Sequence, residues 1–431
     1  MLEHIDLHNA SLNSTIPLEL GLCSNLNFLD FSNNLLQGGL PRAALSGLKK
    51  MRFFGISNSS LTGEIPWDAI TTWTDLELLM LQVNSLTGSI SSEIGRLSNL
   101  TYLYLFSNQL SGTIPKEIGH LTNLLQLDLS TNSFTGPIPP TIGNLTQLNL
   151  LNLFYNNLTG TLPVEIGDMA SVQTIDINTN QLQGELPVSL ADLKNLQFLS
   201  VFTNNFSGSI PRNLGQNTVL TYVGFSNNSF TGELPPGICN GFSLDRITLD
   251  GNNFSGPLPD CLKNCSMLTR ARLEGNQFTG DISEAFGVHP QLSYLDLSRN
   301  QFTGNLSPNW GKYGSLTYLD IEGNKITGNI PPELGNLSNL QYLSLASNDL
   351  TGPIPKEIDL STNSFTGPIP LTIGNMKRLS IFNLFKNNLT GTLPAEIGDL
   401  KYLQIIDIHS NQFDGMLPSS LVYLENLKIL S

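Results

Sequence analysis

A period of 24 residues runs through most of this chain and decides what it can fold into. The pattern LxxLxLxxNxLxGxIP recurs with its asparagine at a fixed place, and eleven consecutive steps from Asn84 to Asn348 are each 24 residues long. Less regular members follow at Asn363, Asn387 and Asn411. A chain of 431 residues would ordinarily form several globular domains. Self-similarity at a fixed period predicts stacked coils without one central core instead.

Each coil is expected to contribute one short strand, because the alternating LxL places two side chains inward and their neighbours outward. Strands stacked at ~4.8 Å form a parallel sheet. The asparagine side chain is both donor and acceptor, so it can satisfy backbone groups where the chain leaves the strand. No helix of normal length fits into the rest of a coil, which predicts short 3-10 turns and extended segments there.

This pattern is identified as the leucine-rich repeat. It implies an α/β-type leucine-rich-repeat solenoid: a curved, superhelical, right-handed stack of coils. The parallel β-sheet is expected on the concave face, with short 3-10 and extended segments on the convex face.

A twelve-residue sequence, DLSTNSFTGPIP, occurs at Asp128–Pro139 and again at Asp359–Pro370. The stretch before the second copy lacks a counterpart of Gly119–Leu127, so the step from Asn348 to Asn363 is much shorter than the steps before it. This pattern indicates duplication of a ten-repeat block followed by deletion inside one coil.

The domain prediction is a single solenoid over residues 1–431 with about 18 repeats, the first and last of them incomplete. The short repeat around 349–363 has two interpretations. It is a local distortion that retains the strand ladder, or a break that separates 1–352 from 359–431. We favour the distortion, since the LxL spacing is kept before Asn363.

Composition and charge exclude several classes of partner. Charged residues make up only 13% of the chain, the net charge is −14, and no cluster of Lys and Arg occurs. Nucleic acid and an anionic membrane surface are therefore not expected as partners. No apolar run approaches the ~18–20 residues that span a bilayer. The N-terminal sequence also lacks the pattern of a signal peptide.

Catalysis is not predicted, and neither is a cofactor or a metal site. The five histidines are scattered, and no nucleophile elbow, HExxH motif or phosphate loop occurs. The carboxylates form columns of the repeat consensus rather than an isolated pair.

The form NxLxGxIP resembles the plant-type repeat of receptor-like kinases and receptor-like proteins, over essentially the whole chain. Residues 238–311, which begin ICNGFSLDRITLDG, are similar to ectodomains of receptor kinases of the male-discoverer-interacting (MIK) type. The resemblance implies an extracellular or plasma-membrane ectodomain with a peptide or protein ligand and a leucine-rich-repeat co-receptor kinase as partner. The cysteine-paired caps, membrane span and kinase of the family are absent from this chain.

The cysteines allow more than one disulfide. Cys239 and Cys265 are separated by slightly more than one repeat period, and Cys239 and Cys261 by slightly less. Neighbouring coils bring either pair within reach of the ~5.5 Å Cα separation that a disulfide needs. The family resemblance favours Cys239–Cys265, free buried thiols are the alternative, and Cys23 is expected to be unpaired.

Sequons for N-glycosylation are dense, with thirteen N-x-S/T triplets. An asparagine-rich consensus creates some of them by accident, yet their density favours a protein of the secretory pathway. The candidate glycosylation sites are Asn58, Asn99, Asn144, Asn157, Asn205, Asn227, Asn253, Asn305, Asn336 and Asn388.

Outward strand positions fall in columns that step by one repeat period, and aromatic residues gather in the first half of them. Large exposed rings on a sheet face mark interaction surfaces. The alternative is that the rings only stabilise one another along the ladder. The predicted patch consists of Tyr102, Tyr104, Phe106, Phe154, Tyr155, Phe198 and Phe202.

A charged stretch follows along the same columns. On a chain so poor in basic residues, neighbouring arginines could grip a carboxylate, although mutual pairing with Asp and Glu is an equal alternative. The candidate residues are Tyr222, Arg246, Asp250, Arg270, Arg272, Glu274 and Tyr294, with Arg299 nearby.

The functional prediction is a non-enzymatic recognition ectodomain, or a fragment of one, from a plant cell-surface receptor that signals in development or immunity. An extended peptide is expected to place apolar side chains on the aromatic patch and a polar end near the arginines. Two alternatives remain: a secreted inhibitor of a cell-wall hydrolase, similar to polygalacturonase inhibitors, and a degenerate receptor remnant.

Overall fold

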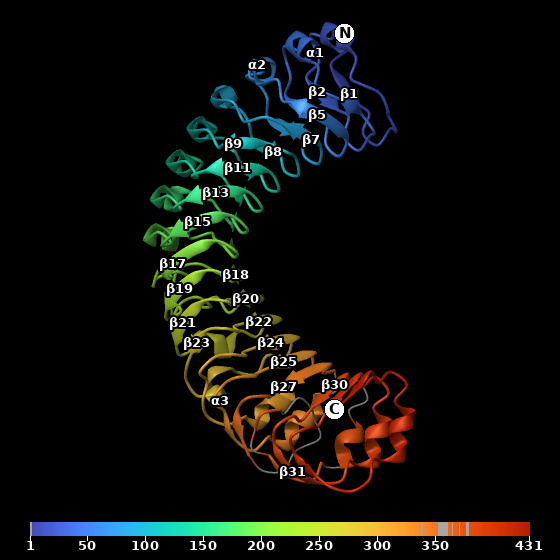
Figure 1. Ribbon diagram of the computed structural model, residues 1–431. Helices are drawn as coiled ribbons and strands as arrows, with labels where there is room; N and C mark the ends of the chain where they lie inside the picture. Colours follow the sequence, from blue (N-terminus) through green and yellow to red (C-terminus); the bar gives the residue numbers. More distant parts are fainter. Residues whose placement is uncertain (1, 338, 352–360, 364, 370, 376–378) are drawn as a thin grey trace. The chain divides into compact units, whose positions relative to one another are not determined.

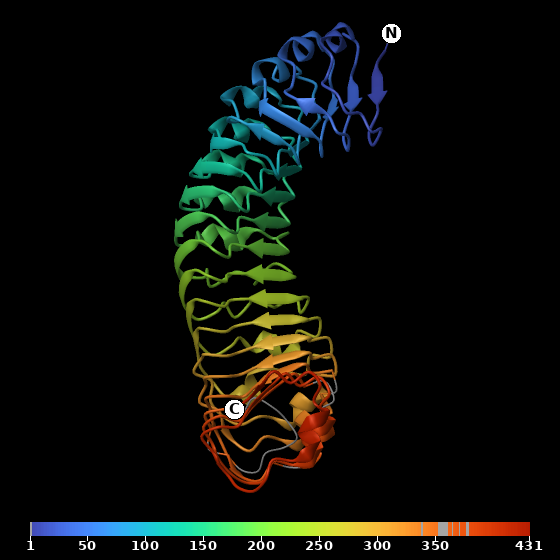
Figure 2. The same ribbon diagram turned by 45° about the vertical axis from the view of Figure 1, so that its right-hand side comes forward.

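The computed structural model describes residues 2–337, 339–351, 361–363, 365–369, 371–375 and 379–431. The chain forms two compact units, Met1–Thr218 and Val219–Ser431. Each unit is a stack of coils in which parallel strands lie on one side and short helical turns on the other (Figures 1 and 2). The predicted leucine-rich-repeat solenoid is thereby confirmed.

The first unit carries an inner sheet of parallel three-residue strands, whose paired residues lie one coil apart, as in Gln126↔Leu150. The central residue of each strand points into the coil, and its two neighbours point outward. The strands, in spatial order, are β1 (His4–Asp6), β2 (Phe28–Asp30), β4 (Phe53–Gly55), β6 (Leu78–Met80), β8 (Tyr102–Tyr104), β10 (Gln126–Asp128), β12 (Leu150–Asn152), β14 (Thr174–Asp176) and β16 (Phe198–Ser200).

The second unit repeats this arrangement. Its inner strands are β18 (Tyr222–Gly224), β20 (Arg246–Thr248), β22 (Arg270–Arg272), β24 (Tyr294–Asp296), β25 (Tyr318–Asp320) and β27 (Tyr342–Ser344), followed by a separate sheet of β30 (Ile381–Asn383), β32 (Ile405–Asp407) and β34 (Ile429–Leu430).

A second row of short strands follows the turn in most coils. In the first unit these are β3 (Gln37–Gly38), β5 (Ser60–Glu64), β7 (Ser85–Thr87), β9 (Ser111–Thr113), β11 (Ser133–Gly136), β13 (Asn157–Gly160), β15 (Gln181–Gly184) and β17 (Asn205–Ser209). In the second they are β19 (Ser229–Gly232), β21 (Asn253–Gly256), β23 (Gln277–Phe278), β26 (Thr327–Gly328), β28 (Asp349–Leu350), β29 (Thr366–Gly367), β31 (Asn388–Gly391) and β33 (Gln412–Phe413).

The return segments are short, as expected, because Pro at the end of the IP motif fixes an extended entry and few residues remain. Most are five-residue 3-10 turns: η1 (Leu18–Leu22), η2 (Ser92–Arg96), η3 (Lys116–His120), η4 (Pro140–Asn144), η5 (Val164–Asp168), η6 (Val188–Asp192), η7 (Asp260–Asn264), η8 (Pro308–Lys312), η9 (Pro332–Asn336), η10 (Leu371–Asn375), η11 (Ala395–Asp399) and η12 (Ser419–Tyr423). Three are short α-helices: α1 (Arg42–Gly47), α2 (Trp67–Ile70) and α3 (Ile282–Ala285).

The repeated asparagine ties each coil to the one before it, and Asn156 is representative. Its Oδ1 accepts a hydrogen bond from the backbone N–H of Phe134 at 3.0 Å. Its Nδ2 donates to the carbonyl oxygens of Leu129 and Leu153, both at 3.1 Å. One buried side chain thus satisfies backbone groups on two coils, as the pattern predicts.

The interior of the second unit contains a stack of phenylalanine rings. Phe230, Phe254, Phe278 and Phe302 are fully buried, and successive ring centroids lie 5.9, 6.0 and 6.3 Å apart. Each ring belongs to a different coil, so the stack packs four coils together through direct ring contact.

Of the short repeat, the structure describes residues 349–351 and 361–363. Asn363 accepts a hydrogen bond from the N–H of Leu350 at 3.3 Å and donates to the carbonyl of Leu345 at 3.1 Å, which are the usual contacts of the repeated asparagine. Residues 352–360 lie outside the described residues. Whether this coil distorts or separates the solenoid therefore stays a prediction.

Candidate functional site

The outward strand positions of the first unit bear a group of aromatic side chains, beginning on β8. Tyr102 and Tyr104 have ring centroids 6.1 Å apart, and Tyr104 meets Phe106 edge-on at 6.4 Å. The Tyr104 hydroxyl donates to Gln126 Oε1 at 2.6 Å, and burial raises its pKa. These contacts hold three half-buried rings in a fixed arrangement.

Phe106, Phe154 and Phe202 occupy the same place on alternate coils, two repeat periods apart. We call these three residues the phenylalanine row. The intervening coils carry the buried polar residues Ser130 and Asn178 at that place, so each ring is flanked by smaller side chains. At a strand spacing of ~4.8 Å, the rings recur about every 10 Å. Each is half-buried and therefore offers both a fixed position and free surface.

Two further predicted members lie differently. Phe198 is the first residue of β16, in the column of Tyr102 rather than in the phenylalanine row. Tyr155 lies in the turn after β12, is 61% exposed and has a φ of 54°. The left-handed backbone conformation directs this residue out of the strand, so it does not belong to the strand face.

The sequence interpretation missed an aromatic stack at the start of the first unit. The rings of His4, Phe28 and Phe53 stack with centroids 4.1 Å apart at both contacts. They occupy the column of Tyr102, one coil apart, so extending that column toward the N-terminus would have found them.

In the second unit, three tyrosines of one column stack face to face. Tyr294 lies 4.2 Å from Tyr318, which lies 4.4 Å from Tyr342. The Arg270 guanidinium covers the far face of the stack, 4.0 Å from the Tyr294 ring centroid. A cation over an aromatic ring is attracted electrostatically, and Arg270 has no carboxylate partner among the described residues.

Arg272, by contrast, is already paired. It forms ion pairs with Asp250 at 3.1 Å and with Glu274 at 2.5 Å, and its side chain is only 34% exposed. Burial raises the pKa of the Glu274 carboxyl. For Arg272 the structure therefore favours mutual pairing over a free carboxylate grip.

Arg246, on β20, lies one coil before Arg270 in the same column. Its side chain is 58% exposed and pairs with the neighbouring Asp245 at 3.2 Å. Because such exposed pairs contribute little, this guanidinium remains available to another carboxylate. Tyr222, one coil earlier, is half-buried and lies over Gly224, where a Cβ would come within 2.7 Å of the tyrosine hydroxyl.

The predicted disulfide Cys239–Cys265 is wrong. Cys239 pairs with Cys261, with a Cα separation of 5.5 Å. Cys265 is a buried free thiol whose Sγ donates to the carbonyl of Cys261 at 3.4 Å. Cys239, Cys261 and Cys265 lie close together, so their spacing in the sequence did not distinguish a Cys239–Cys261 disulfide from a Cys239–Cys265 disulfide. Cys23 is unpaired, as expected.

All ten candidate glycosylation sites are exposed, from Asn58 to Asn388. Exposure of the asparagine is necessary for modification but does not demonstrate it, so glycosylation stays a prediction. Asn144 and Asn336 each end a 3-10 turn, whereas Asn157 and Asn388 each begin a strand of the second row.

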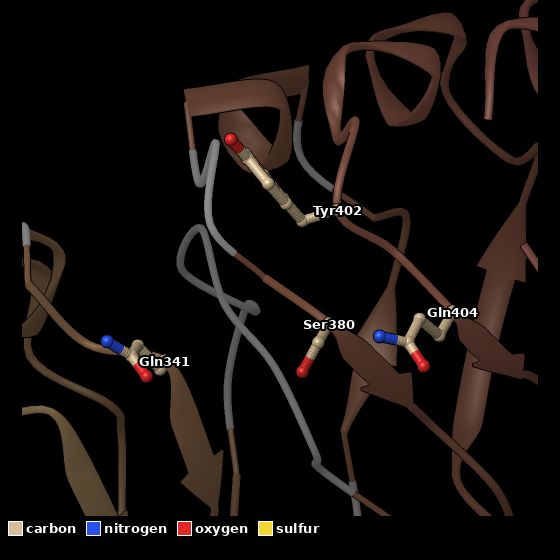
Figure 3. Close-up of a pocket in the computed structure, with 4 residues that line it drawn as sticks. All are labelled: Gln341, Ser380, Tyr402 and Gln404. Carbon is tan, nitrogen blue, oxygen red and sulfur yellow. The ribbon is translucent and has the colours of Figure 1, made fainter. Parts of the chain in front are cut away.

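A hollow of about 380 Å³ lies in the second unit, near the beginnings of β27, β30 and β32 (Figure 3). It is lined by Gln341, Ser380, Tyr402 and Gln404. These side chains offer amide and hydroxyl groups for hydrogen bonding. The lining residues that the structure describes include no carboxylate, imidazole or thiol, so we assign no acid–base chemistry to this hollow.

No group of three or more His, Cys, Asp or Glu side chains among the described residues is placed to hold a metal ion. No helix in the described part of the chain has the length and apolar character needed to cross a bilayer.

Family models for the leucine-rich repeat match residues 290–350 and also 99–121, 123–145, 147–169, 219–240, 243–265 and 356–376. A comparison with curated proteins gives no match.

Solved structures of plant receptors are similar over nearly the whole chain. The Arabidopsis receptor kinase HAESA, in complex with the peptide hormone IDA and the co-receptor SERK1, is 34% identical with a TM-score of 0.87; the match covers 99% of this chain and 77% of HAESA. The plant peptide hormone receptor RGFR1, in complex with RGF2, is 33% identical with a TM-score of 0.86, covering 97% and 72%.

The leucine-rich-repeat ectodomain of GASSHO1/SCHENGEN3 from Arabidopsis thaliana, in complex with CASPARIAN STRIP INTEGRITY FACTOR 2, is also similar. It is 34% identical with a TM-score of 0.84, and the match covers 97% of this chain and 54% of the ectodomain.

Proposed function

Because this chain belongs to the family of plant leucine-rich-repeat receptor-kinase ectodomains, we propose that it is a non-enzymatic recognition module that binds a peptide on its strand face. The phenylalanine row carries this proposal. Half-buried rings held at a regular interval on a rigid sheet supply apolar contact area without a large ordering cost on binding.

The spacing of the phenylalanine row favours one conformation of the peptide ligand. Rings on alternate coils recur about every 10 Å, and a peptide in polyproline II conformation repeats every three residues, or about 9 Å. A segment lying across the strands would therefore place every third side chain near a ring. Aromatic-lined grooves recognise such preformed extended peptides in other folds.

The second unit supplies a separate contact surface for an acidic group. Arg246 is exposed, and Arg270 lacks a carboxylate partner among the described residues. Arg272 serves instead to hold Asp250 and Glu274 in place. We therefore assign recognition of a ligand carboxylate to Arg246 and Arg270.

The co-receptor and the cellular location are proposed from the family. HAESA is in complex with a co-receptor as well as a hormone, and this chain is proposed to act outside the cell with a comparable kinase partner. The ten exposed sequons support that location.

The test selects peptides from a random 12-residue phage-display library on the immobilised full chain. Selected peptides are then titrated by calorimetry into the wild type and into Phe154→Ala and Phe202→Ala. Each truncation is expected to cost on the order of 2 kcal/mol of binding free energy, because it removes a central aromatic anchor.

Val188→Ala is the matched control, since Val188 is an apolar side chain exposed on the opposite side of the same unit. It is expected to leave affinity unchanged. Failure of the library to yield any binder would overturn the proposal, and so would peptides that bind both phenylalanine variants as tightly as the wild type.

A further inference from the structure

We propose that Asn157 carries an N-linked glycan whose first N-acetylglucosamine packs on the ring of Tyr155. This removes Tyr155 from the predicted ligand patch and gives it a different role, the positioning of a sugar. The proposal rests on the extracellular location proposed above but not on any ligand, so the two can fail separately.

Tyr155 and Asn157 line one surface hollow of about 350 Å³ in the first unit. The other lining residues are Asn132, Ser133, Asn156 and Thr179, so three successive coils contribute to it. Asn157 is exposed and its side chain has no hydrogen-bond partner among the described residues. Its amide nitrogen is therefore free to be modified, with an aromatic ring in the same hollow.

The backbone of Tyr155 follows the repeat, since Thr131 and Thr179, at the same place one coil away on either side, also have a positive φ, but the fold does not require an aromatic ring there. Its φ of 54° lies in the left-handed region, which is costly for a bulky side chain. The backbone tolerates this because its N–H donates to the carbonyl of Asn178 at 3.0 Å, and its own carbonyl accepts from the N–H of Asn132 at 3.2 Å. The ring itself remains 61% exposed and contributes little to packing. The exposed ring is therefore available to contact a sugar attached to Asn157.

The chemistry of a sugar fits this ring. One face of a pyranose presents C–H groups that pack on an aromatic face, while its hydroxyl and acetamido groups remain available to polar neighbours. Ser133 and Thr179 supply hydroxyl neighbours around the hollow, whereas the amides of Asn132 and Asn156 are buried and already hydrogen-bonded to backbone groups.

The donor is a polyprenyl-diphosphate-linked oligosaccharide of the secretory pathway. The Asn157 Nδ2 forms a bond to C1 of its first N-acetylglucosamine and loses one proton. The bond from C1 to the phosphate oxygen breaks, and the polyprenyl diphosphate leaves with the electron pair. No oxidation or reduction occurs.

The duplicated block of the chain provides a natural comparison. The sequence NNLTG occurs at Asn156–Gly160 and again at Asn387–Gly391, and both asparagines that begin the sequons are exposed. The residue before the second copy is Lys386, which has the same left-handed backbone with a φ of 57°. The second sequon, at Asn388, therefore shares the backbone and lacks the aromatic ring.

The experiment expresses the full chain with an added signal peptide in plant cells and trims its glycans to a single N-acetylglucosamine. Glycopeptide mass spectrometry measures occupancy at Asn157. Hydrogen–deuterium exchange of the segment 155–160 is compared among the wild type, Tyr155→Lys, Asn157→Gln and the double variant. Loss of the glycan is expected to speed local exchange roughly three- to tenfold when Tyr155 is present, and not when lysine replaces it.

The reciprocal variant Lys386→Tyr is expected to create the same protection around Asn388. Tyr155→Lys reproduces the residue found in the second copy, so it is expected to fold. An unmodified Asn157 in the secreted chain would overturn the proposal. Equal effects of glycan removal with tyrosine and with lysine at position 155 would overturn it as well.

Discussion

At the scale of single residues, the thiol of Cys265 gives a direct check on the disulfide. Burial raises its pKa to about 11, so the reactive thiolate is scarce at neutral pH. We expect non-reducing peptide mapping to find Cys239 linked to Cys261. Iodoacetamide should modify Cys265 only after unfolding, whereas the partly exposed Cys23 serves as the control and should react in the folded chain. A linked Cys239–Cys265 peptide would contradict the structure.

His289 gives the stability of the second unit a pH dependence. It is fully buried, its Nδ1–H donates to the carbonyl of Cys265 at 3.0 Å, and burial lowers its pKa below the usual 6.5. Below pH 6.5 the unfolded chain therefore binds a proton that the folded chain does not, so stability falls as pH decreases through this range.

The measurement is the urea midpoint of wild type and His289→Leu between pH 5 and pH 8. Below about pH 6.5 the stability of the variant is expected to fall less steeply with decreasing pH than that of the wild type. His120→Gln, at an exposed position, is the control. An identical pH dependence for wild type and His289→Leu would exclude the buried histidine as its source.

Residue positions could be predicted from the sequence, but side-chain partners could not. The columns correctly placed Arg270 and Arg272 on one strand, yet one guanidinium lies over Tyr294 and the other pairs with Asp250 and Glu274. Such choices depend on rotamers and on neighbouring coils, which the repeat period does not encode. The sequence prediction also placed Tyr155 on the strand face, because residue spacing does not reveal a left-handed turn.

At the scale of elements, the coils of the second unit depend on the stacked phenylalanines. Phe254→Ala removes a fully buried ring that contacts Phe230 and Phe278. The loss is expected to lower the free energy of unfolding by about 3–5 kcal/mol, because the surrounding coils collapse only partly into the cavity. Chemical denaturation followed by circular dichroism measures it.

The control for this prediction is Val288→Ala, a truncation at a position in the same unit whose side chain is 40% exposed. It is expected to change stability by no more than about 0.5 kcal/mol. A Phe254→Ala variant as stable as this control would show that the stack does not hold the coils together.

Strands and turns were the elements that the sequence predicted best, because each follows from a local rule. Inward leucines define the strand, and asparagine satisfies the backbone where the strand ends. Proline limits the return to a short turn. The coil ending at Asn363 breaks the period, and there the same rules predict the asparagine contacts but not the path of the shortened return.

At the scale of the whole molecule, the proposed function is peptide binding at the phenylalanine row. Photo-crosslinking tests this most directly. A peptide selected from the 12-residue library is synthesised with benzophenone at one apolar position, irradiated with the full chain and mapped by mass spectrometry. We predict crosslinks within residues 102–106, 150–154 and 198–202, which carry the row and its strands. Crosslinks confined to the turns Pro140–Asn144 and Val164–Asp168, on the opposite side, would contradict it.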